Sequence, residues 1–207
     1  MKSVRVFYNK SGNLKYISHL DMNRVFTRII KRSGIPVWYT EGFNPHPKIN
    51  FALPLALGFE STSEIVDIRI ADDEYPCSEV LSRLQKAMPT GLFVKSVSEP
   101  RMKVGDVRYA RFEVTLSETA GFDDFFSQDS IVIDKRTKSG TKATDIKPLI
   151  REYSVDGNKL SLVLSAGESN LNPTLVIDAA EMFYKSPICI KNIVRTDVYN
   201  GEMQSFC

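Results

Sequence analysis

The sequence predicts an α+β protein of two tandem ferredoxin-like units, each an antiparallel sheet with helices on one face. The chain has 207 residues, enough for two domains of about 100 residues each. Its first half alternates strand and helix patterns in the order βαββαβ, and a similar order follows a polar segment. We therefore expect a first domain over residues 1–98, a linker over 99–107 and a second domain over 108–207.

The strongest single element is a helix over residues 18–33. Ser18 is a good N-cap, and Asp21 follows three residues later, where it can face the free amides of the first turn. Gly34 and Pro36 end the pattern. Apolar residues recur at helical spacing on one side: Met22, Val25, Phe26, Ile29 and Ile30.

The other elements are predicted from alternation, turn residues and helical spacing. In the first unit we expect strands over 3–8, 37–40 (resumed over 50–53 after the loop), 63–71 and 92–97, and a second helix over 76–88. In the second unit we expect strands over 108–116, 130–135, 159–164 and 193–199, helices over 119–128 and 172–183, a flexible basic turn over 138–144 and an extended or irregular segment over 145–153.

Composition excludes several classes of protein. With 43% hydrophobic and 25% charged residues, the chain is not disordered or fibrous. No run of apolar residues approaches the length of about 18 that a membrane helix needs, and the start lacks a signal-peptide pattern. Its three cysteines are far apart, which argues against a disulfide framework, a zinc site or an iron–sulfur cluster. We expect a cytoplasmic protein with no metal, no cofactor and no membrane partner.

Positive charge is concentrated at the start of the chain. Residues 1–50 carry nine Lys or Arg and two Asp or Glu, a net charge of +7. Arg24, Arg28 and Lys31 follow at spacings of four and three, so they share one side of the predicted helix. This basic stripe is interpreted either as a phosphate-binding surface or as an ordinary solvated helix face.

The first turn of that helix carries a second group of candidates. Ser18, His19 and Asp21 lie where the helix dipole favours an anion and a neutral imidazole. A neutral His19 beside free amides could bind a phosphate or carboxylate. Alternatively, these residues simply cap and pack the helix.

The segment 42–48 reads Gly-Phe-Asn-Pro-His-Pro-Lys, and its prolines predict a stiff, extended loop. Phe43, Asn44, His46 and Lys48 are its candidate binding residues. His46 and Lys48 are also weak catalytic candidates, because an imidazole and an ammonium can support metal-free RNA cleavage. We expect both to share a solvent-facing hollow with the guanidinium groups of the helix. Local hydrogen bonding without function is the alternative.

Aromatic residues are frequent among these basic residues. Arg and Lys beside aromatic rings on a sheet surface can pair with phosphates and stack bases, although aromatic residues also fill the core of small domains. The residues concerned are Phe7, Tyr8, Tyr16, Trp38, Tyr39 and Phe43.

Four motifs together resemble the bacterial radical SAM-linked protein family, a domain of unknown function, in its stand-alone form. They lie at residues 16–24 (Tyr-Ile-Ser-His-Leu-Asp-Met-x-Arg), 42–48, 55–61 (Leu-x-Leu-Gly-x-x-Ser) and 145–150 (Asp-Ile-Lys-Pro-Leu-Ile). The resemblance implies a partner that recognises substrate for a radical SAM enzyme or docks that enzyme. The chain lacks a Cys-x-x-x-Cys-x-x-Cys motif, so it is not expected to be the radical enzyme itself.

Three functions remain open. The first is a non-catalytic RNA-binding or substrate-adaptor protein that works with a radical SAM protein on tRNA or rRNA. The second is a metal-independent RNA-processing enzyme that uses His46 and Lys48. The third is a protein–protein scaffold that grips its partner with the loop 42–48 and the surface of helix 18–33.

Overall fold

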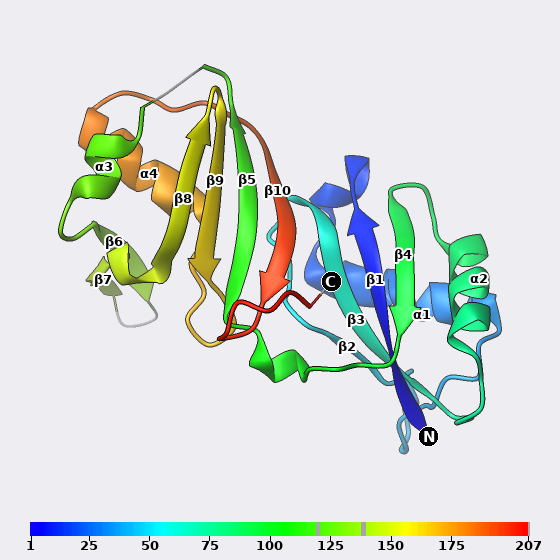
Figure 1. The fold of residues 1–207 in the computed structure, drawn as a ribbon. Coiled ribbons are helices and arrows are strands. Elements are labelled where there is room, and N and C mark those ends of the chain that lie inside the picture. The colour runs from blue at the N-terminus through cyan, green and yellow to red at the C-terminus, as the bar shows by residue number, and fades with distance from the viewer. Residues whose placement is uncertain (119–120, 138–139, 207) are drawn as a thin grey trace. The chain divides into compact units, whose positions relative to one another are not determined.

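The computed structural model describes residues 1–118, 121–137 and 140–206, and the structure is α+β (Figure 1). The chain forms two compact units, here called unit 1 and unit 2. Unit 1 comprises Met1–Val107 together with Phe206 near the C-terminus, and unit 2 comprises Arg108–Ser205. Within the described residues, no helix has the length and apolar character that crossing a membrane requires.

Unit 1 is an antiparallel sheet with two helices on one face (Figure 1). The strand order is β4-β1-β3-β2. In chain order the elements are β1 (Lys2–Lys10), η1 (Gly12–Tyr16), α1 (His19–Ser33), β2 (Ile49–Phe51), β3 (Glu60–Ile70), α2 (Cys77–Ala87), β4 (Leu92–Ser98) and η2 (Val104–Asp106).

Helix α1 confirms the prediction for residues 18–33. Ser18 is the N-cap, and its hydroxyl accepts a hydrogen bond from the Asp21 amide. Gly34 ends the helix with φ of 65°, a left-handed conformation that a residue without a Cβ adopts without strain. The apolar side packs on the sheet through Met22, Phe26, Ile29 and Ile30, which are all buried.

The two faces of the unit 1 sheet differ in chemistry because successive side chains of a strand point to opposite sides. Val66, Ile68 and Ile70 of β3 belong to the core under α1 and α2. Between them, Asp67 and Arg69 point to the other face, here called the open face. On β1, Arg5 also points there and is only 2% exposed. Its guanidinium donates two hydrogen bonds to the Asp67 carboxylate, of 2.7 and 2.9 Å.

The predicted strand over residues 37–40 is wrong. The structure has two isolated bridges here, Val37 with Ile70 and Tyr39 with Pro47. The hydrogen bonds on either side of the Tyr39–Pro47 pair are made, from the Thr40 amide to the His46 carbonyl and from the Lys48 amide to the Trp38 carbonyl, but the pairing does not continue into a strand. Strand β3 begins at Glu60, earlier than predicted, and the predicted linker over 99–107 contains η2.

Unit 2 has its own antiparallel strand order, β10-β5-β9-β8, and a separate hairpin of β6 and β7. Helix α4 lies on one face of the sheet (Figure 1). In chain order the elements are β5 (Tyr109–Leu116), α3 (Asp123–Ser127), β6 (Val132–Thr137), β7 (Gly140–Asp145), η3 (Lys147–Leu149), β8 (Ile150–Asp156), β9 (Lys159–Ser165), α4 (Pro173–Tyr184) and β10 (Ile190–Tyr199).

One prediction for unit 2 needs correction. The segment expected as a flexible basic turn, 138–144, contains most of β7, while residues 138 and 139 lie outside the described residues. The segment expected to be extended or irregular, 145–153, contains η3 and the start of β8. Strand β7 pairs with β6 away from the main sheet, so it carries no apolar alternation from which a strand could be predicted.

We predict that Asp67→Ala lowers the free energy of unfolding by about 3 kcal/mol, because it leaves the buried charge of Arg5 uncompensated. Urea denaturation measures the change. Glu79→Ala is the matched control, since Glu79 pairs with Arg83 at 3.1 Å with side chains 53% and 45% exposed. We expect the control to lose less than about 0.5 kcal/mol. Equal losses in the two variants would show that the Arg5–Asp67 pair is not structural.

Candidate nucleic-acid interface

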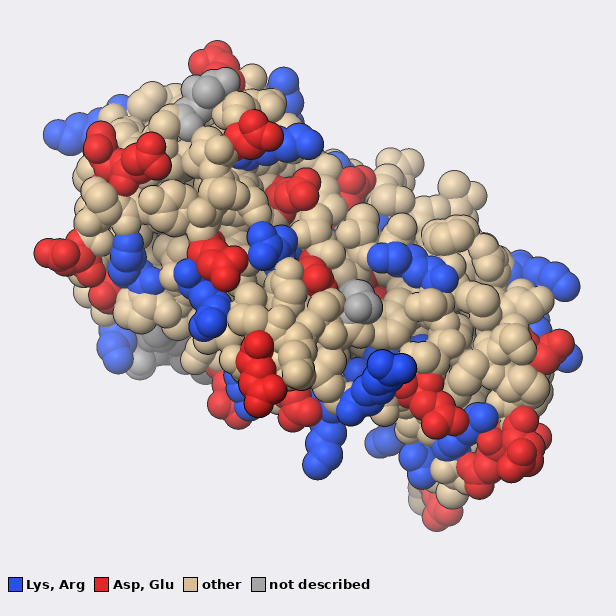
Figure 2. All heavy atoms as spheres, viewed as in Figure 1, with Lys and Arg blue, Asp and Glu red and all other residues tan. Residues whose placement is uncertain are grey.

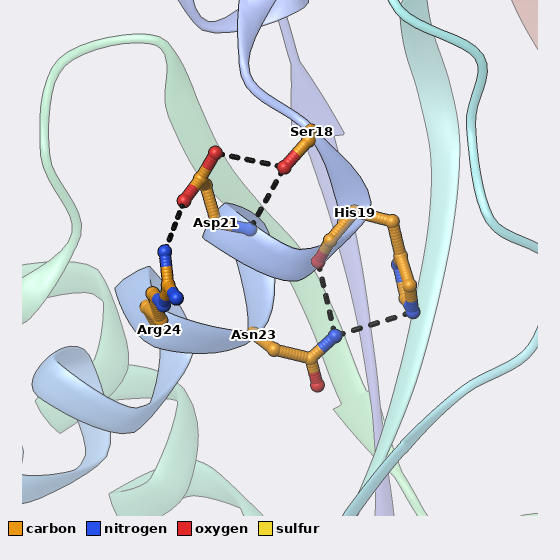
Figure 3. Close-up of polar contacts among 5 residues, drawn as sticks. All are labelled: Ser18, His19, Asp21, Asn23 and Arg24. Atoms are coloured by element: carbon orange, nitrogen blue, oxygen red, sulfur yellow. Dashed lines mark hydrogen bonds and ion pairs between the residues drawn. The ribbon is translucent and has the colours of Figure 1, made fainter.

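The N-terminus of α1 is occupied by its own carboxylate (Figure 3). The Ser18 hydroxyl donates to Asp21 Oδ2 at 2.7 Å, and Arg24 donates to Asp21 Oδ1 at 2.9 Å. The hydrogen bond from Ser18, followed by that from Arg24, lowers the pKa of Asp21 from its ordinary value of 3.8. The predicted anion site at this helix end therefore already holds an anion, the side chain of Asp21.

His19 points to another side of the same turn (Figure 3). The Asn23 side-chain amide donates to the His19 carbonyl at 3.0 Å and lies 3.2 Å from His19 Nε2, which accepts. The imidazole packs edge-on against the ring of Phe51, with centroids 5.2 Å apart. It borders a space of about 10 Å³ that Lys10 and Glu64 also line. That volume suits about one water molecule and not a cofactor.

The basic stripe of α1 is exposed, as predicted. Arg24, Arg28 and Lys31 are all exposed to solvent. Arg24 is engaged by Asp21 of its own helix. Arg24, Arg28 and Lys31 line none of the hollows described in this section.

The loop 42–48 is exposed except for Pro47. His46 Nδ1 lies 3.0 Å from the Thr40 hydroxyl and 3.2 Å from the Asn44 carbonyl, which can only accept. The Thr40 amide also donates to the His46 carbonyl at 2.9 Å, so the base of the loop is closed by its own hydrogen bonds. Phe43 at the tip is fully exposed, at 105%.

Lys48 is placed beside Trp38 and Arg69 by three backbone hydrogen bonds. The Lys48 amide donates to the Trp38 carbonyl at 3.0 Å, the Arg69 amide to the Lys48 carbonyl at 3.0 Å, and the Trp38 amide to the Arg69 carbonyl at 2.8 Å. All three side chains line one hollow of about 370 Å³ on the open face, here called the Trp38 hollow. Ser3, Asn50 and Asp67 supply polar groups to the same hollow.

A wider groove of about 720 Å³ adjoins the Trp38 hollow, and Ser3, Asn50, Asp67 and Arg69 line both. The two are lined by five basic residues, namely Lys2, Lys48, Arg69, Arg101 and Lys103, and by two acidic ones, Asp67 and Glu99.

Both acidic groups of this groove have basic neighbours. Asp67 is held by Arg5 at 2.7 Å, and Glu99 lies 4.0 Å from Lys2. Figure 2 shows Lys and Arg interspersed with Asp and Glu over the viewed face. A groove with an excess of positive charge attracts anions.

The prediction that His46 and Lys48 share a hollow with the guanidinium groups of α1 is wrong. Ile49 pairs with Ile68 and packs on the core side with α1. Alternation therefore turns Lys48 to the open face, on the opposite side of the sheet from α1. His46 lies two residues before Lys48, with the buried Pro47 between them, so these two do share a side.

Sequence reasoning did not select Arg69 as a site residue, and it noted Trp38 only as one of several aromatic residues. The available signal was the alternation of polar and apolar residues in the strand predicted over 63–71, where Asp67 and Arg69 occupy successive outward positions. Among the residues that the structure describes, no group of three or more His, Cys, Asp and Glu could hold a metal ion.

Comparison with known proteins gives one family match. A family model described as "Uncharacterized protein conserved in bacteria (DUF2344)" matches residues 3–173. No curated protein matches the chain. A solved structure, described as the crystal structure of a pseudouridylate synthase, is similar over 97% of this chain at 10% sequence identity and a TM-score of 0.41. The chain spans 65% of the length of that structure.

We predict that Ser18→Ala raises the pKa of Asp21 toward 3.8 more than Arg24→Ala does, because the Ser18 hydrogen bond lowers it most. NMR titration of the Asp21 carboxyl carbon measures this. A carboxyl whose pKa is lowered by folding stabilises the fold above its unfolded pKa and loses that contribution as pH falls through the folded value. Asp21→Asn should therefore flatten the loss of stability in that acidic range. An unshifted Asp21 would contradict the arrangement at the helix start.

Proposed function

We propose that the chain, which belongs to the DUF2344 family of uncharacterised proteins conserved in bacteria, is a non-catalytic RNA-binding or substrate-adaptor protein that works with a radical SAM enzyme. One observation carries the RNA part: five basic residues line two adjoining hollows of unit 1, one of which Trp38 also lines. RNA offers the two chemistries that such a surface can engage, phosphates for Lys and Arg and aromatic bases for the indole.

The cations of the groove are better placed for a phosphate than those of α1. Arg24 already pairs with Asp21 at 2.9 Å, whereas in the groove Asp67 pairs with Arg5, which does not line it, and Glu99 lies 4.0 Å from Lys2. Lys48 and Arg69 line a concave site, where an anion can contact both at once. Concavity matters because it brings several charges within reach of one phosphate.

The partnership with a radical SAM enzyme rests on the family resemblance of the motifs at 16–24, 42–48, 55–61 and 145–150. The loop 42–48 supports a protein contact independently. Its tip presents Phe43 at 105% exposure, and the loop base is fixed by hydrogen bonds between Thr40 and His46. A rigid loop with an exposed aromatic ring is a good anchor for a partner protein. This observation also favours the second candidate function, a protein–protein scaffold.

We also propose that both units are ferredoxin-like. The strand order β4-β1-β3-β2 in unit 1 and β10-β5-β9-β8 in unit 2 supports this, because each places the first and third strands of the unit at the centre. In chain order, α3 and the β6–β7 hairpin of unit 2 occupy the position that α1 occupies in unit 1, between the first and second strands of the sheet. The cysteine usage favours a cytoplasmic location for the protein.

We predict that RNA binding falls with salt and depends on the groove. In filter-binding titrations of tRNA and rRNA fragments between about 50 and 200 mM salt, Lys48→Ala and Arg69→Ala should each reduce the salt slope by about one phosphate contact. Arg28→Ala is the matched control, since it removes an exposed cation from α1. Loss of binding in Arg28→Ala but not Lys48→Ala would place RNA on α1. Binding without salt dependence would remove the RNA part.

The same RNA, labelled and incubated with protein and EDTA, tests the enzymatic alternative. We expect it to stay intact. Cleavage that His46→Ala abolishes would instead assign an RNA-processing activity to this loop.

We predict that a radical SAM protein co-purifies with the tagged chain and that Phe43→Ala reduces its recovery severalfold, because the exposed ring is the anchor. Mass spectrometry of affinity eluates, with and without RNase, measures this. Recovery that RNase abolishes would mean that RNA bridges the two proteins. Val132→Ala, which trims an exposed apolar side chain of unit 2, is the control. The absence of any radical SAM protein from the eluates would contradict the partnership.

A further inference from the structure

We propose that the Trp38 hollow binds one unpaired nucleobase against the indole of Trp38, so that the groove takes RNA as a single strand. This inference rests on the proposed RNA binding and deepens it by naming the form of RNA recognised. The hollow, of about 370 Å³, falls within the range of roughly 300–1,000 Å³ that small-molecule sites occupy.

The orientation of Trp38 is set by its neighbours. Val37 and Tyr39 pack with the core under α1, so Trp38 between them turns to the open face. It is half-buried and lines the hollow. An indole held at the wall of an open hollow presents an aromatic surface on which a base can stack.

Charged residues line the same hollow as the indole. Lys48 and Arg69 are its hydrogen-bonded backbone neighbours, and both line the hollow. The Arg69 guanidinium also donates to the Ser3 hydroxyl at 3.1 Å, which fixes its position. The negative charge of Asp67 repels a phosphate only weakly, because Arg5 donates to both of its carboxylate oxygens.

Polar groups are available for the edge of the base. Asn50, which is exposed, and Ser3 line the hollow and the adjoining groove. An amide offers both a donor and an acceptor, which matches the edges that an unpaired base exposes. In a duplex these edges are paired and the faces of the bases are stacked on one another, so a duplex could not reach the indole.

The adjoining groove provides a path for the neighbouring nucleotides. It shares Ser3, Asn50 and Arg69 with the Trp38 hollow and continues past Lys2, Arg101 and Lys103. A cationic track that leads away from an aromatic platform is the arrangement by which proteins hold single strands. A free mononucleotide would use the hollow alone and gain nothing from the three cations farther along.

The test uses the full chain and its own fluorescence. Trp38 is the only tryptophan of the chain, so its emission reports on this hollow alone. We expect unlabelled oligouridylate and oligoadenylate to quench the emission with saturation. Polyphosphate, uridine monophosphate and a duplex RNA, each at equal phosphate concentration, should leave it nearly unchanged. Arg28→Ala, on α1, should give the same quenching curve as the wild type.

Substitution provides the second readout. Trp38→Leu should weaken oligonucleotide binding about tenfold, since stacking on one ring contributes roughly 1–3 kcal/mol and 1.4 kcal/mol is tenfold. Trp38→Phe should retain most of the affinity, because a phenyl ring can still stack on a base. If substitution at this position simply unfolded the protein, Trp38→Phe would lose binding as well. Binding to the wild type, measured without mutation, keeps the proposal testable even if Trp38→Leu does not fold.

The outcomes separate this inference from the function on which it rests. Salt-sensitive binding of oligonucleotides that Lys48→Ala weakens, with unchanged Trp38 emission, would overturn the base site and leave RNA binding standing. Equal quenching by duplex and single strand, or by polyphosphate, would also overturn it. Quenching by the mononucleotide as strong as by the oligonucleotide would assign the hollow to a free nucleotide instead. No binding of any RNA would remove both proposals.

Discussion

The alternation of side chains along β1 and β3 determines both the stability of unit 1 and where its charges are presented. Val66, Ile68 and Ile70 pack under the helices, and the residues between them form the open face. A slip of one residue in register would exchange the two sets. The Arg5–Asp67 pair lies in the middle of this open face, with Arg5 only 2% exposed, so its two hydrogen bonds satisfy groups that would otherwise be buried without partners.

This alternation also separates two sets of basic residues, those of α1 and those of the open face. The cations of α1 belong to a helix whose start is already stabilised by Asp21, and Arg24 is bound to that carboxylate. The cations of the open face surround a concave site, and the acidic groups there are held by Arg5 and Lys2. Charged groups in a concave, partly desolvated site next to an aromatic ring interact more strongly with a nucleotide than charged groups on a solvated helix do.

Local signals in the sequence predicted the elements well where the signal was complete. Helix α1 could be bounded because its cap, its apolar spacing and Gly34 all lie within one segment. The Trp38 hollow could not be predicted, because Trp38, Lys48 and Arg69 meet only through backbone pairing of distant segments. Segment charge was also misleading: residues 51–100 carry four Lys or Arg and eight Asp or Glu, yet they supply Arg69 to the basic groove. The net charge of a segment does not reveal which face of a strand each residue occupies.

The central claim is that RNA contacts the open face of unit 1 and not the basic side of α1. Ultraviolet cross-linking of single-stranded RNA to the protein, followed by mass spectrometry of the linked peptides, tests it most directly. Cross-links should map to residues 38–50, with further ones in 99–105, where Trp38, Lys48 and Arg101 line the two hollows. Cross-links confined to residues 19–33 of α1 would contradict the account.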